Sequence, residues 1–303
     1  MQLEGTYTAI VTPFRDAPGQ PVDWEALDAL VDAQVAAGVA GVVPVGTTGE
    51  SPTLTHEEHD EVIARTVKRA RGRVQVVAGT GSNSTREAIG TSQAAERAGA
   101  DAVMLVCPYY NRPTQEGLHA HFVEVAKSVR VPVVVYNIPV RTGCDLLPET
   151  LARIAEAAPN VVATKEATGN VLRAQKIAQL MGGAMTVLSG DDALTLAMVA
   201  VGARGVISVT SNVLPAEVSR ATRLALEGPA HEALAAHLAL MPVHEAMFVE
   251  ANPAPVKAAL AARGVMKDVV RSPMAACTPG ARATVVAALD AYAARARAGR
   301  GAA

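Results

Sequence analysis

The sequence predicts an α/β protein, a (β/α)8 TIM barrel with a helical extension at its C-terminal end. Three observations support this fold class. Short runs rich in Val and Ile alternate with stretches of helical spacing up to about residue 228 of the 303 residues. Most of these runs lack the polar alternation of a half-exposed strand, as strands of a parallel sheet covered on both faces do. A glycine closely followed by an apolar run also recurs, at 37–45, 98–106 and 201–209.

Each predicted strand is a short apolar run, and the spacing between runs leaves room for a helix. The eight runs are 6–14, 41–46, 74–81, 102–108, 131–137, 161–167, 186–192 and 205–211. Two intervening helices are expected to begin with capping boxes, one from Thr55 to Glu58 and one from Ser84 to Glu87. In the recurring motif, glycine suits the left-handed end of a helix just before the next strand. Eight such units predict a catalytic barrel at 1–228.

After residue 228 the alternation of strand and helix patterns stops. The remaining chain has helical spacing at about 230–248, 254–263 and 281–298. We therefore expect 229–303 to form a helical C-terminal extension.

Composition narrows the class of protein. Half of the residues are hydrophobic but only 3% are aromatic, so the core must be built from Ala, Val, Leu and Ile. A net charge of −2 favours neither a nucleic acid nor an anionic membrane as partner. The N-terminus lacks a signal-peptide pattern, and no apolar run approaches the roughly 20 residues of a membrane helix. The three cysteines form no CxxC pair, and we expect a cytoplasmic protein.

Reactive side chains collect where the predicted strands end, the face on which parallel barrels keep their chemistry. Lys165 lies near the end of the sixth strand. Burial would lower its pKa and make it a Schiff-base nucleophile, whereas a solvated lysine paired with Glu166 is the ordinary alternative. Tyr136 and Tyr110, at neighbouring strand ends, favour the nucleophile because they offer partners for proton transfer.

Other residues of this rim suggest anion binding. Thr47 and Thr48 lie in a glycine-bracketed turn that could hold a carboxylate or a phosphate. Arg141 could bind a carboxylate through two parallel hydrogen bonds, or be a solvated loop arginine. No metal site is predicted, because His56 and His59 lack an evident third ligand. The glycine loops match neither the Walker nor the dinucleotide pattern, so the residues alone leave the substrate open.

Taken together, these residues resemble the class I pyruvate-dependent lyases of the dihydrodipicolinate synthase and N-acetylneuraminate lyase group. The resemblance extends from about Gly5 to about Thr278, and its blocks favour the synthase branch. These blocks are VGTTGESPTLTHEEH, CPYYNRPTQEGL, YNIPVRTGCDLLPET, KEATGN, LSGDD, GVISVTSN and FVEANPAPVK.

The resemblance implies a reaction without a cofactor. Pyruvate would form an imine and condense with L-aspartate 4-semialdehyde, on the diaminopimelate route to lysine. It also implies the site residues: Lys165 for the imine; Tyr136, Thr47 and Tyr110 for a proton relay, Tyr110 serving the neighbouring subunit; Thr48 with backbone at Gly190 and Ile207 for the pyruvate carboxylate; and Arg141 for the semialdehyde carboxylate.

The same resemblance implies a homotetramer, a dimer of dimers, and a second site for L-lysine as a feedback inhibitor. The residues implied for that site are Ser51, His56, His59, Asn83, Glu87 and Tyr109. Pro52 stands where many relatives carry Ala, and it removes a backbone N–H from this loop. Three alternatives remain open: a lyase acting on a sugar acid such as N-acetylneuraminate, a sugar-phosphate isomerase on the same fold, and a catalytically silent amino-acid sensor.

Overall fold

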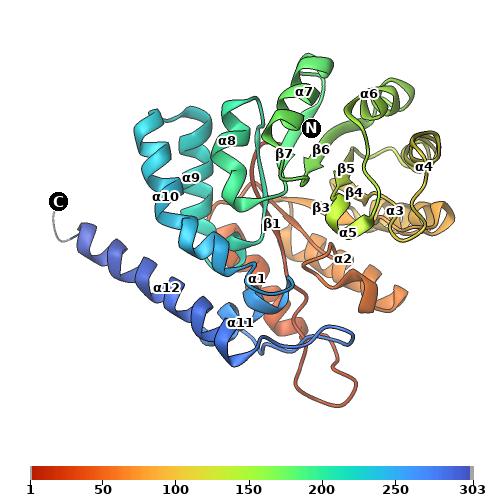
Figure 1. Cartoon of the computed structure of the whole chain (residues 1–303). Coiled ribbons are helices and arrows are strands. Elements are labelled where there is room, and N and C mark those ends of the chain that lie inside the picture. Colours follow the sequence, from red (N-terminus) through yellow and green to blue (C-terminus); the bar gives the residue numbers. More distant parts are fainter. Residues whose placement is uncertain (1, 301–303) are drawn as a thin grey trace.

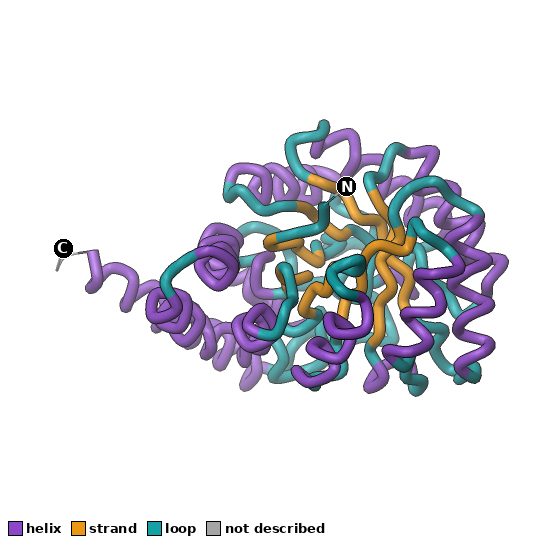
Figure 2. Tube along the Cα trace, turned by 90° about the horizontal axis from the view of Figure 1, so that it is seen from above, coloured by secondary structure: helices purple, strands orange, loops and turns teal. Residues whose placement is uncertain are grey.

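The centre of the molecule is a closed barrel of eight parallel strands (Figures 1 and 2). The computed structural model describes residues 2–300. Each strand pairs with its neighbours along the chain, and β1 pairs with β8 to close the barrel. The strands are β1 (Gly5–Ala9), β2 (Gly41–Val43), β3 (Gln75–Gly79), β4 (Ala102–Val106), β5 (Val133–Asn137), β6 (Val161–Glu166), β7 (Thr186–Ser189) and β8 (Gly205–Ser208).

Helices surround the barrel, and short helical turns lie in the loops after β2, β5, β7 and β8. The surrounding helices are α1 (Trp24–Ala36), α2 (His56–Ala70), α3 (Thr85–Ala98), α4 (Gln115–Lys127), α6 (Pro148–Ala157), α7 (Val171–Met181), α8 (Thr195–Ala200) and α9 (Pro215–Glu227). The loop turns are η1 (Ser51–Thr53), α5 (Pro139–Thr142), η2 (Asp192–Leu194) and η3 (Thr210–Asn212).

The predicted fold class is confirmed, and all eight predicted runs contain a strand. Several strands end earlier than their apolar runs. The strand of the first run, 6–14, is Gly5–Ala9, which begins one residue before the run, and the strand of the run 41–46 is Gly41–Val43. The residues beyond these ends leave the sheet and form the rim of the barrel. Hydrophobicity alone cannot mark that point, because the rim is also largely buried.

Local sequence signals mark the ends of several helices. Gly38, Gly99 and Gly202 have φ angles of 70°, 90° and 114°, so the recurring glycine takes the left-handed conformation each time. The Thr55–Glu58 capping box forms in both directions, with N···O distances of 3.0 and 3.2 Å.

The second predicted capping box forms only in part. The Ser84 hydroxyl accepts the Glu87 N–H at 3.5 Å, which caps the helix. The Glu87 carboxylate accepts instead from the Ser82 hydroxyl, at 2.5 Å. The prediction was therefore wrong for the acidic half of this box, because a nearer donor in the preceding loop satisfies the carboxylate.

Three helices follow the barrel: α10 (Ala230–Ala246), α11 (Ala254–Ala262) and α12 (Pro279–Arg300). They pack together beside α9 and over the rim after β1 and β8 (Figure 1). One apolar cluster joins these helices to the barrel and includes Ile10, Val209, Leu240, Val256 and Val285. The extension therefore shares a hydrophobic core with the barrel. Within residues 2–300, no helix is both long and apolar enough to span a bilayer.

Candidate active site

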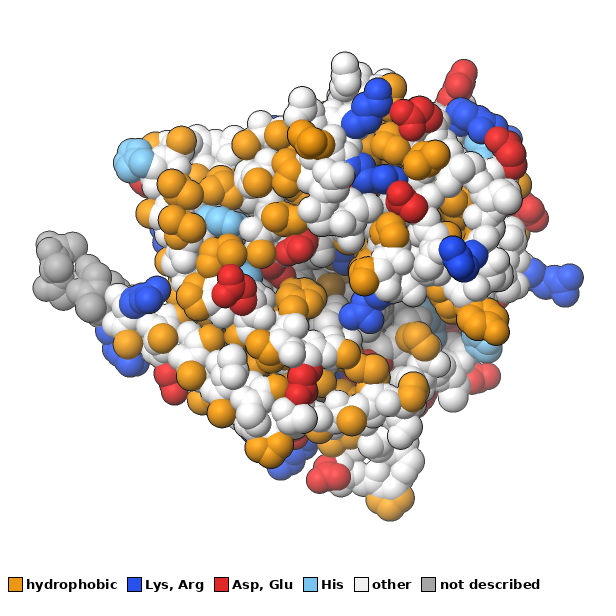
Figure 3. Space-filling model, in the orientation of Figure 1, with side chains coloured by type: hydrophobic (Ala, Val, Ile, Leu, Met, Phe, Trp, Pro, Cys, Tyr) orange, Lys and Arg blue, Asp and Glu red, His pale blue; other side chains and the backbone are white. Residues whose placement is uncertain are grey.

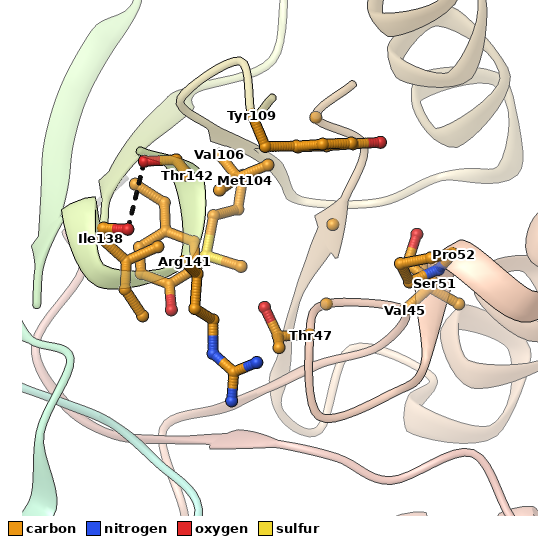
Figure 4. A pocket seen from close by; sticks show the side chains of 14 residues that line it. Val45, Thr47, Ser51, Pro52, Met104, Val106, Tyr109, Ile138, Arg141 and Thr142 are labelled. Atoms are coloured by element: carbon orange, nitrogen blue, oxygen red, sulfur yellow. Dashed lines mark hydrogen bonds between the residues drawn. The ribbon is translucent and has the colours of Figure 1, made fainter. Parts of the chain in front are cut away.

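A cavity of about 230 Å³ opens at the rim formed by the loops after β2, β3, β4 and β5 (Figure 4). Met104 and Val106 contribute apolar surface, and Thr47, Tyr109 and Arg141 contribute polar groups. Figure 4 shows the Arg141 side chain extending from α5 toward Thr47. Over the face drawn in Figure 3, positive and negative side chains are interspersed, so no extended patch of one sign stands out.

The alternation of β6 directs Lys165 into the barrel. Ala163 belongs to the cluster inside the barrel, and Lys165, two residues later, lies on the same face. Glu166 faces outward, where its carboxylate lies 3.3 Å from Nε of Arg173. The alternative pairing of Lys165 with Glu166 is therefore excluded, because the two side chains lie on opposite faces of the sheet. Lys165 lies in register with Tyr136 on the neighbouring strand.

The environment of the Lys165 amine suits a nucleophile. The side chain is buried, and Nζ lies 4.3 Å from the ring centroid of Tyr136. It makes no hydrogen bond or ion pair with any of residues 2–300. Burial lowers the pKa of Lys165 to about 8, although the Asp192 carboxylate opposes this effect. At pH 7 about a tenth of the amine is then neutral, on the order of 10²-fold more than for an ordinary lysine.

Tyr136 connects this amine to the cavity. Lys165 is not itself a lining residue, but Tyr136 and Thr47 are. Burial raises the pKa of Tyr136 to about 12, while the charge of Arg141 and a hydrogen bond with Thr47 oppose the rise. The phenol therefore keeps its proton at neutral pH and can pass it along the Thr47 hydroxyl. The structure brings the predicted site residues Lys165, Tyr136 and Thr47 together.

Tyr110 does not join them within one chain. Its side chain is 90% exposed, and it does not line the cavity. Its backbone has φ 74°, and its N–H donates to the Thr142 carbonyl at 3.2 Å. This held backbone turns the phenol outward, whereas the adjacent Tyr109 lines the cavity.

The two side chains predicted to hold carboxylates converge on one residue of the extension. The Thr48 hydroxyl accepts from the Asn252 amide at 2.9 Å, and Arg141 Nη2 donates to the Asn252 carbonyl at 3.4 Å. The Gly190 N–H already donates to the Glu166 carbonyl at 2.7 Å, so only the Gly190 carbonyl is left for a ligand. Ile207 is buried on β8 and belongs to the cluster inside the barrel.

Five of the six residues implied for a lysine site lie in adjoining loops and helix starts. Asn83 donates to the Tyr109 carbonyl at 3.2 Å, and His56 Nε2 lies 3.5 Å from a Glu87 oxygen. Ser51 and Tyr109 both line the cavity. His59 differs from them: it is buried, and its Nε2 lies 3.0 Å from the Gly79 carbonyl. Its ring is therefore directed at the end of β3.

Sequence reasoning missed the supporting residues. The charge of the Asp192 carboxylate favours the protonated form of Lys165. Asp192 also accepts hydrogen bonds from three donors at the end of β8. Asn252 and Lys257 belong to the block FVEANPAPVK, but their contacts with the barrel could not be read from spacing. Their signal was a polar or charged residue within an apolar stretch. Across residues 2–300, no three His, Cys, Asp or Glu side chains are placed to hold a metal ion.

Comparison with known proteins agrees with this geometry. The family model described as the dihydrodipicolinate synthetase family matches residues 2–292. The 4-hydroxy-tetrahydrodipicolinate synthase of Sorangium cellulosum is 56% identical over 289 residues, which cover 95% of this chain and 96% of that protein.

Two solved structures are also similar over nearly the full chain. The chloride-inhibited dihydrodipicolinate synthase of Acinetobacter baumannii, complexed with pyruvate, has a TM-score of 0.94 and 40% identity, covering 96% of this chain and 99% of that one. The dihydrodipicolinate synthase of Cyanidioschyzon merolae, with lysine bound, has a TM-score of 0.92 and 37% identity, covering 96% and 98%. With its closed barrel, its buried inward lysine and these matches, the chain is an enzyme that belongs to the dihydrodipicolinate synthetase family.

Proposed function

We propose that this enzyme condenses pyruvate with L-aspartate 4-semialdehyde to give 4-hydroxy-tetrahydrodipicolinate, through an imine on Lys165. One observation carries the proposal: a buried amine that makes no ion pair within residues 2–300 lies over the ring of a cavity-lining tyrosine. The names of the relatives support the same reaction.

The proposed chemistry begins at the neutral amine. Lys165 attacks the keto carbon of pyruvate, and loss of water gives the imine, which withdraws electrons from the methyl group. A methyl proton then leaves, and the enamine attacks the aldehyde carbon of the second substrate to form the new C–C bond. The substrate's own amine displaces Lys165 as the ring closes. Tyr136 and Thr47 carry the protons that these steps release and take up.

Two polar side chains hold the substrates in this scheme. The Thr48 hydroxyl donates to the pyruvate carboxylate, with the backbone of Ile207 beside it. The Gly190 carbonyl can only accept a hydrogen bond, so it is left for a protonated group of the substrate and not for the carboxylate. The Arg141 guanidinium binds the carboxylate of the semialdehyde. A guanidinium matches a carboxylate through two parallel hydrogen bonds, which favours this short substrate over the polyhydroxylated chain of a sugar acid.

Assembly completes the proposed relay. Tyr110 is 90% exposed and Val140 88% exposed, an arrangement suited to contact with a second copy. We infer a homotetramer in which Tyr110 enters the neighbouring subunit's site. Replacing Tyr110 by Phe should reduce turnover much more than it weakens pyruvate binding, because its proposed role is proton transfer. The described helices of the extension share one apolar cluster with the barrel, so we infer a single folding unit. A cytoplasmic location fits this biosynthetic role.

Feedback inhibition by L-lysine is a further part of the proposal. Ser51, His56, Asn83, Glu87 and Tyr109 lie in adjoining loops and helix starts, where Glu87 offers a carboxylate to an amino group. The lysine-bound relative supports such a site. A titration with millimolar L-lysine should reduce turnover, and unchanged turnover would remove this part of the proposal.

The decisive experiment traps the imine. The enzyme is incubated with pyruvate, reduced with borohydride and digested for mass spectrometry. The peptide that contains Lys165 should gain the mass of a reduced pyruvyl group. An adduct on Lys176 or Lys257 instead, or none, would contradict the proposal. An assay that compares L-aspartate 4-semialdehyde with the aldehyde substrate of N-acetylneuraminate lyase then separates the two activities.

A further inference from the structure

We propose that Asn252, in the C-terminal extension, is a positioning residue that orients both carboxylate-binding side chains, Thr48 and Arg141. Asn252 lies between α10 and α11, outside the barrel in sequence but against its rim in space. The inference rests on the substrate roles proposed for Thr48 and Arg141, and it assigns to the extension a part in substrate binding.

The side chain of Asn252 leaves the Thr48 hydroxyl free to act as a hydrogen-bond donor. Its amide N–H donates to Thr48 Oγ1 at 2.9 Å, and both residues are buried, Asn252 at 5% exposure. A hydroxyl has one hydrogen to donate. Because its oxygen accepts from the amide, that hydrogen remains free for an anionic oxygen. An isolated threonine hydroxyl would rotate among several partners, whereas this one is held as a donor toward the pyruvate carboxylate.

The backbone of Asn252 restrains the second anion-binding group. Its carbonyl accepts from Arg141 Nη2 at 3.4 Å. Arg141 is otherwise exposed, and a free arginine side chain loses much rotamer freedom on binding. Holding one of its five N–H donors aims the guanidinium and leaves other donors for a carboxylate. One residue thus fixes the relative placement of the two substrate subsites.

A buried ion pair holds the segment that carries Asn252. Lys257, on α11, pairs with Glu50 and donates to the Val269 carbonyl at 2.9 Å. Glu50 follows Thr48 by two residues, has φ 56°, and accepts from the Arg271 N–H at 3.0 Å. The loop with Thr48 is therefore joined to the extension through Asn252, through Lys257 and through the Arg271 N–H. The contacts of Asn252 and Lys257 are buried, so water does not replace them easily.

Asn160 provides a matched control for a purely structural amide. Its side chain donates to three backbone carbonyls, those of Ala126, Val129 and Val131, at 2.8 to 3.3 Å. It precedes β6, at the end of the barrel opposite the cavity. Loss of this amide should lower the melting temperature without changing substrate affinity.

The test compares Asn252→Ala, Asn252→Asp and Asn160→Ala in the full chain. Borohydride trapping gives the pyruvate concentration at half-maximal adduct formation, and steady-state assays give KM for both substrates and kcat. Asn252→Ala should raise the half-maximal pyruvate concentration about tenfold, the effect of one hydrogen bond, with smaller changes in kcat and in the semialdehyde KM, because the backbone carbonyl that holds Arg141 remains. Asn252→Asp should raise the half-maximal pyruvate concentration further. Its carboxylate would accept the hydrogen bond of the Thr48 hydroxyl and would repel the carboxylate of the substrate. Asn160→Ala should leave these values unchanged.

Wild-type half-maximal concentrations in both Asn252 variants would overturn the inference, as would an equal rise in Asn160→Ala. Wild-type pyruvate binding in Asn252→Asp alone would also overturn the inference. It would mean that the Thr48 hydroxyl donates to residue 252 and not to the substrate. If Asn252→Ala does not fold, the isosteric Asn252→Asp variant decides. Failure of the proposed function has a different signature: the wild-type enzyme itself then gives no adduct on Lys165.

Discussion

Two buried lysines, Lys165 at the barrel mouth and Lys257 where the extension meets the barrel, share most of their environment. Burial lowers the pKa of each to about 8. Each Nζ lies over an aromatic ring, at 4.3 Å from the centroid of Tyr136 and 4.2 Å from that of Phe14. Yet Lys257 is bound by Glu50 and by a backbone carbonyl, whereas Lys165 has no hydrogen-bond or ion-pair partner within residues 2–300.

Burial alone therefore does not distinguish the two lysines, and their hydrogen-bond and ion-pair partners do. An ammonium group held by a carboxylate and a carbonyl stays protonated. Its nitrogen then has no free lone pair for attack, and its N–H groups are already bonded. An unpaired amine beside a cavity can lose its proton and attack a carbonyl carbon. Lys257 accordingly ties the extension to the Thr48 loop, and Lys165 is the proposed nucleophile.

Lys165→Met should produce the largest effect on activity. Turnover should fall by at least on the order of 10³-fold, because the covalent route is lost. The fold should become more stable at neutral pH by on the order of 2 kcal/mol, since burial of a charged amine no longer opposes folding. Assays of turnover and denaturant unfolding measure both effects, with the exposed Lys176→Met as control. Comparable activity in Lys165→Met and Lys176→Met would end the distinction between the two lysines.

Lys257→Met should instead destabilise the fold. It leaves the Glu50 carboxylate buried without its partner, which costs about 3–5 kcal/mol in comparable sites. Adding Glu50→Gln removes the uncompensated charge and should restore most of the free energy of unfolding. The measurement is denaturant unfolding of the wild type, both single variants and the double variant. The borohydride adduct should still form on Lys165 in every variant that folds, and its loss in the double variant would contradict the assigned roles.

The pH dependence sharpens the contrast at Lys165. Since its pKa is lowered to about 8, the neutral fraction should rise about tenfold per pH unit up to about pH 7, more slowly toward pH 8, and level off above it. Initial rates of imine trapping should follow this curve. For stability, the unfolded chain binds the extra proton between the folded pKa near 8 and the ordinary value of 10.5. Stability should therefore rise with pH across that window, and this rise should be smaller in Lys165→Met. A trapping rate that is flat from pH 6 to 8 would contradict the lowered pKa.

Phe14→Leu should have the smallest effect. The Phe14 ring lies under both Lys257 and Arg271, at 4.2 and 4.3 Å from its centroid. Its loss should cost about 1 kcal/mol more than the loss of packing alone. The control is Phe122→Leu. Phe122 is buried but lies under neither of these cations, so this variant measures the cost of lost packing alone. Thermal unfolding measures the difference between the two variants, and equal losses would show that the ring does not stabilise these cations.

Much of this molecule followed from its sequence. The eight apolar runs predicted the barrel, and glycines such as Gly99 predicted the helix ends, because strand burial and left-handed backbone depend on local residue type. The position of Lys165 near a strand end predicted its place at the rim. Period-two alternation along β6 then separates Lys165 from Glu166, so even the inward direction of the amine is a property of the local chain.

The tertiary structure alone decided which partners the reactive groups have. Asn252 lies 204 positions from the Thr48 hydroxyl that it orients, and Lys257 is similarly distant from Glu50. No periodicity or local motif specifies such contacts, because they depend on how the extension packs over the rim. The sequence by itself determined the barrel and the candidate amine. The packing of distant segments decided that Lys257 pairs with Glu50, whereas Lys165 has no ion-pair partner among residues 2–300, since solvation and charge pairing depend on neighbours in space.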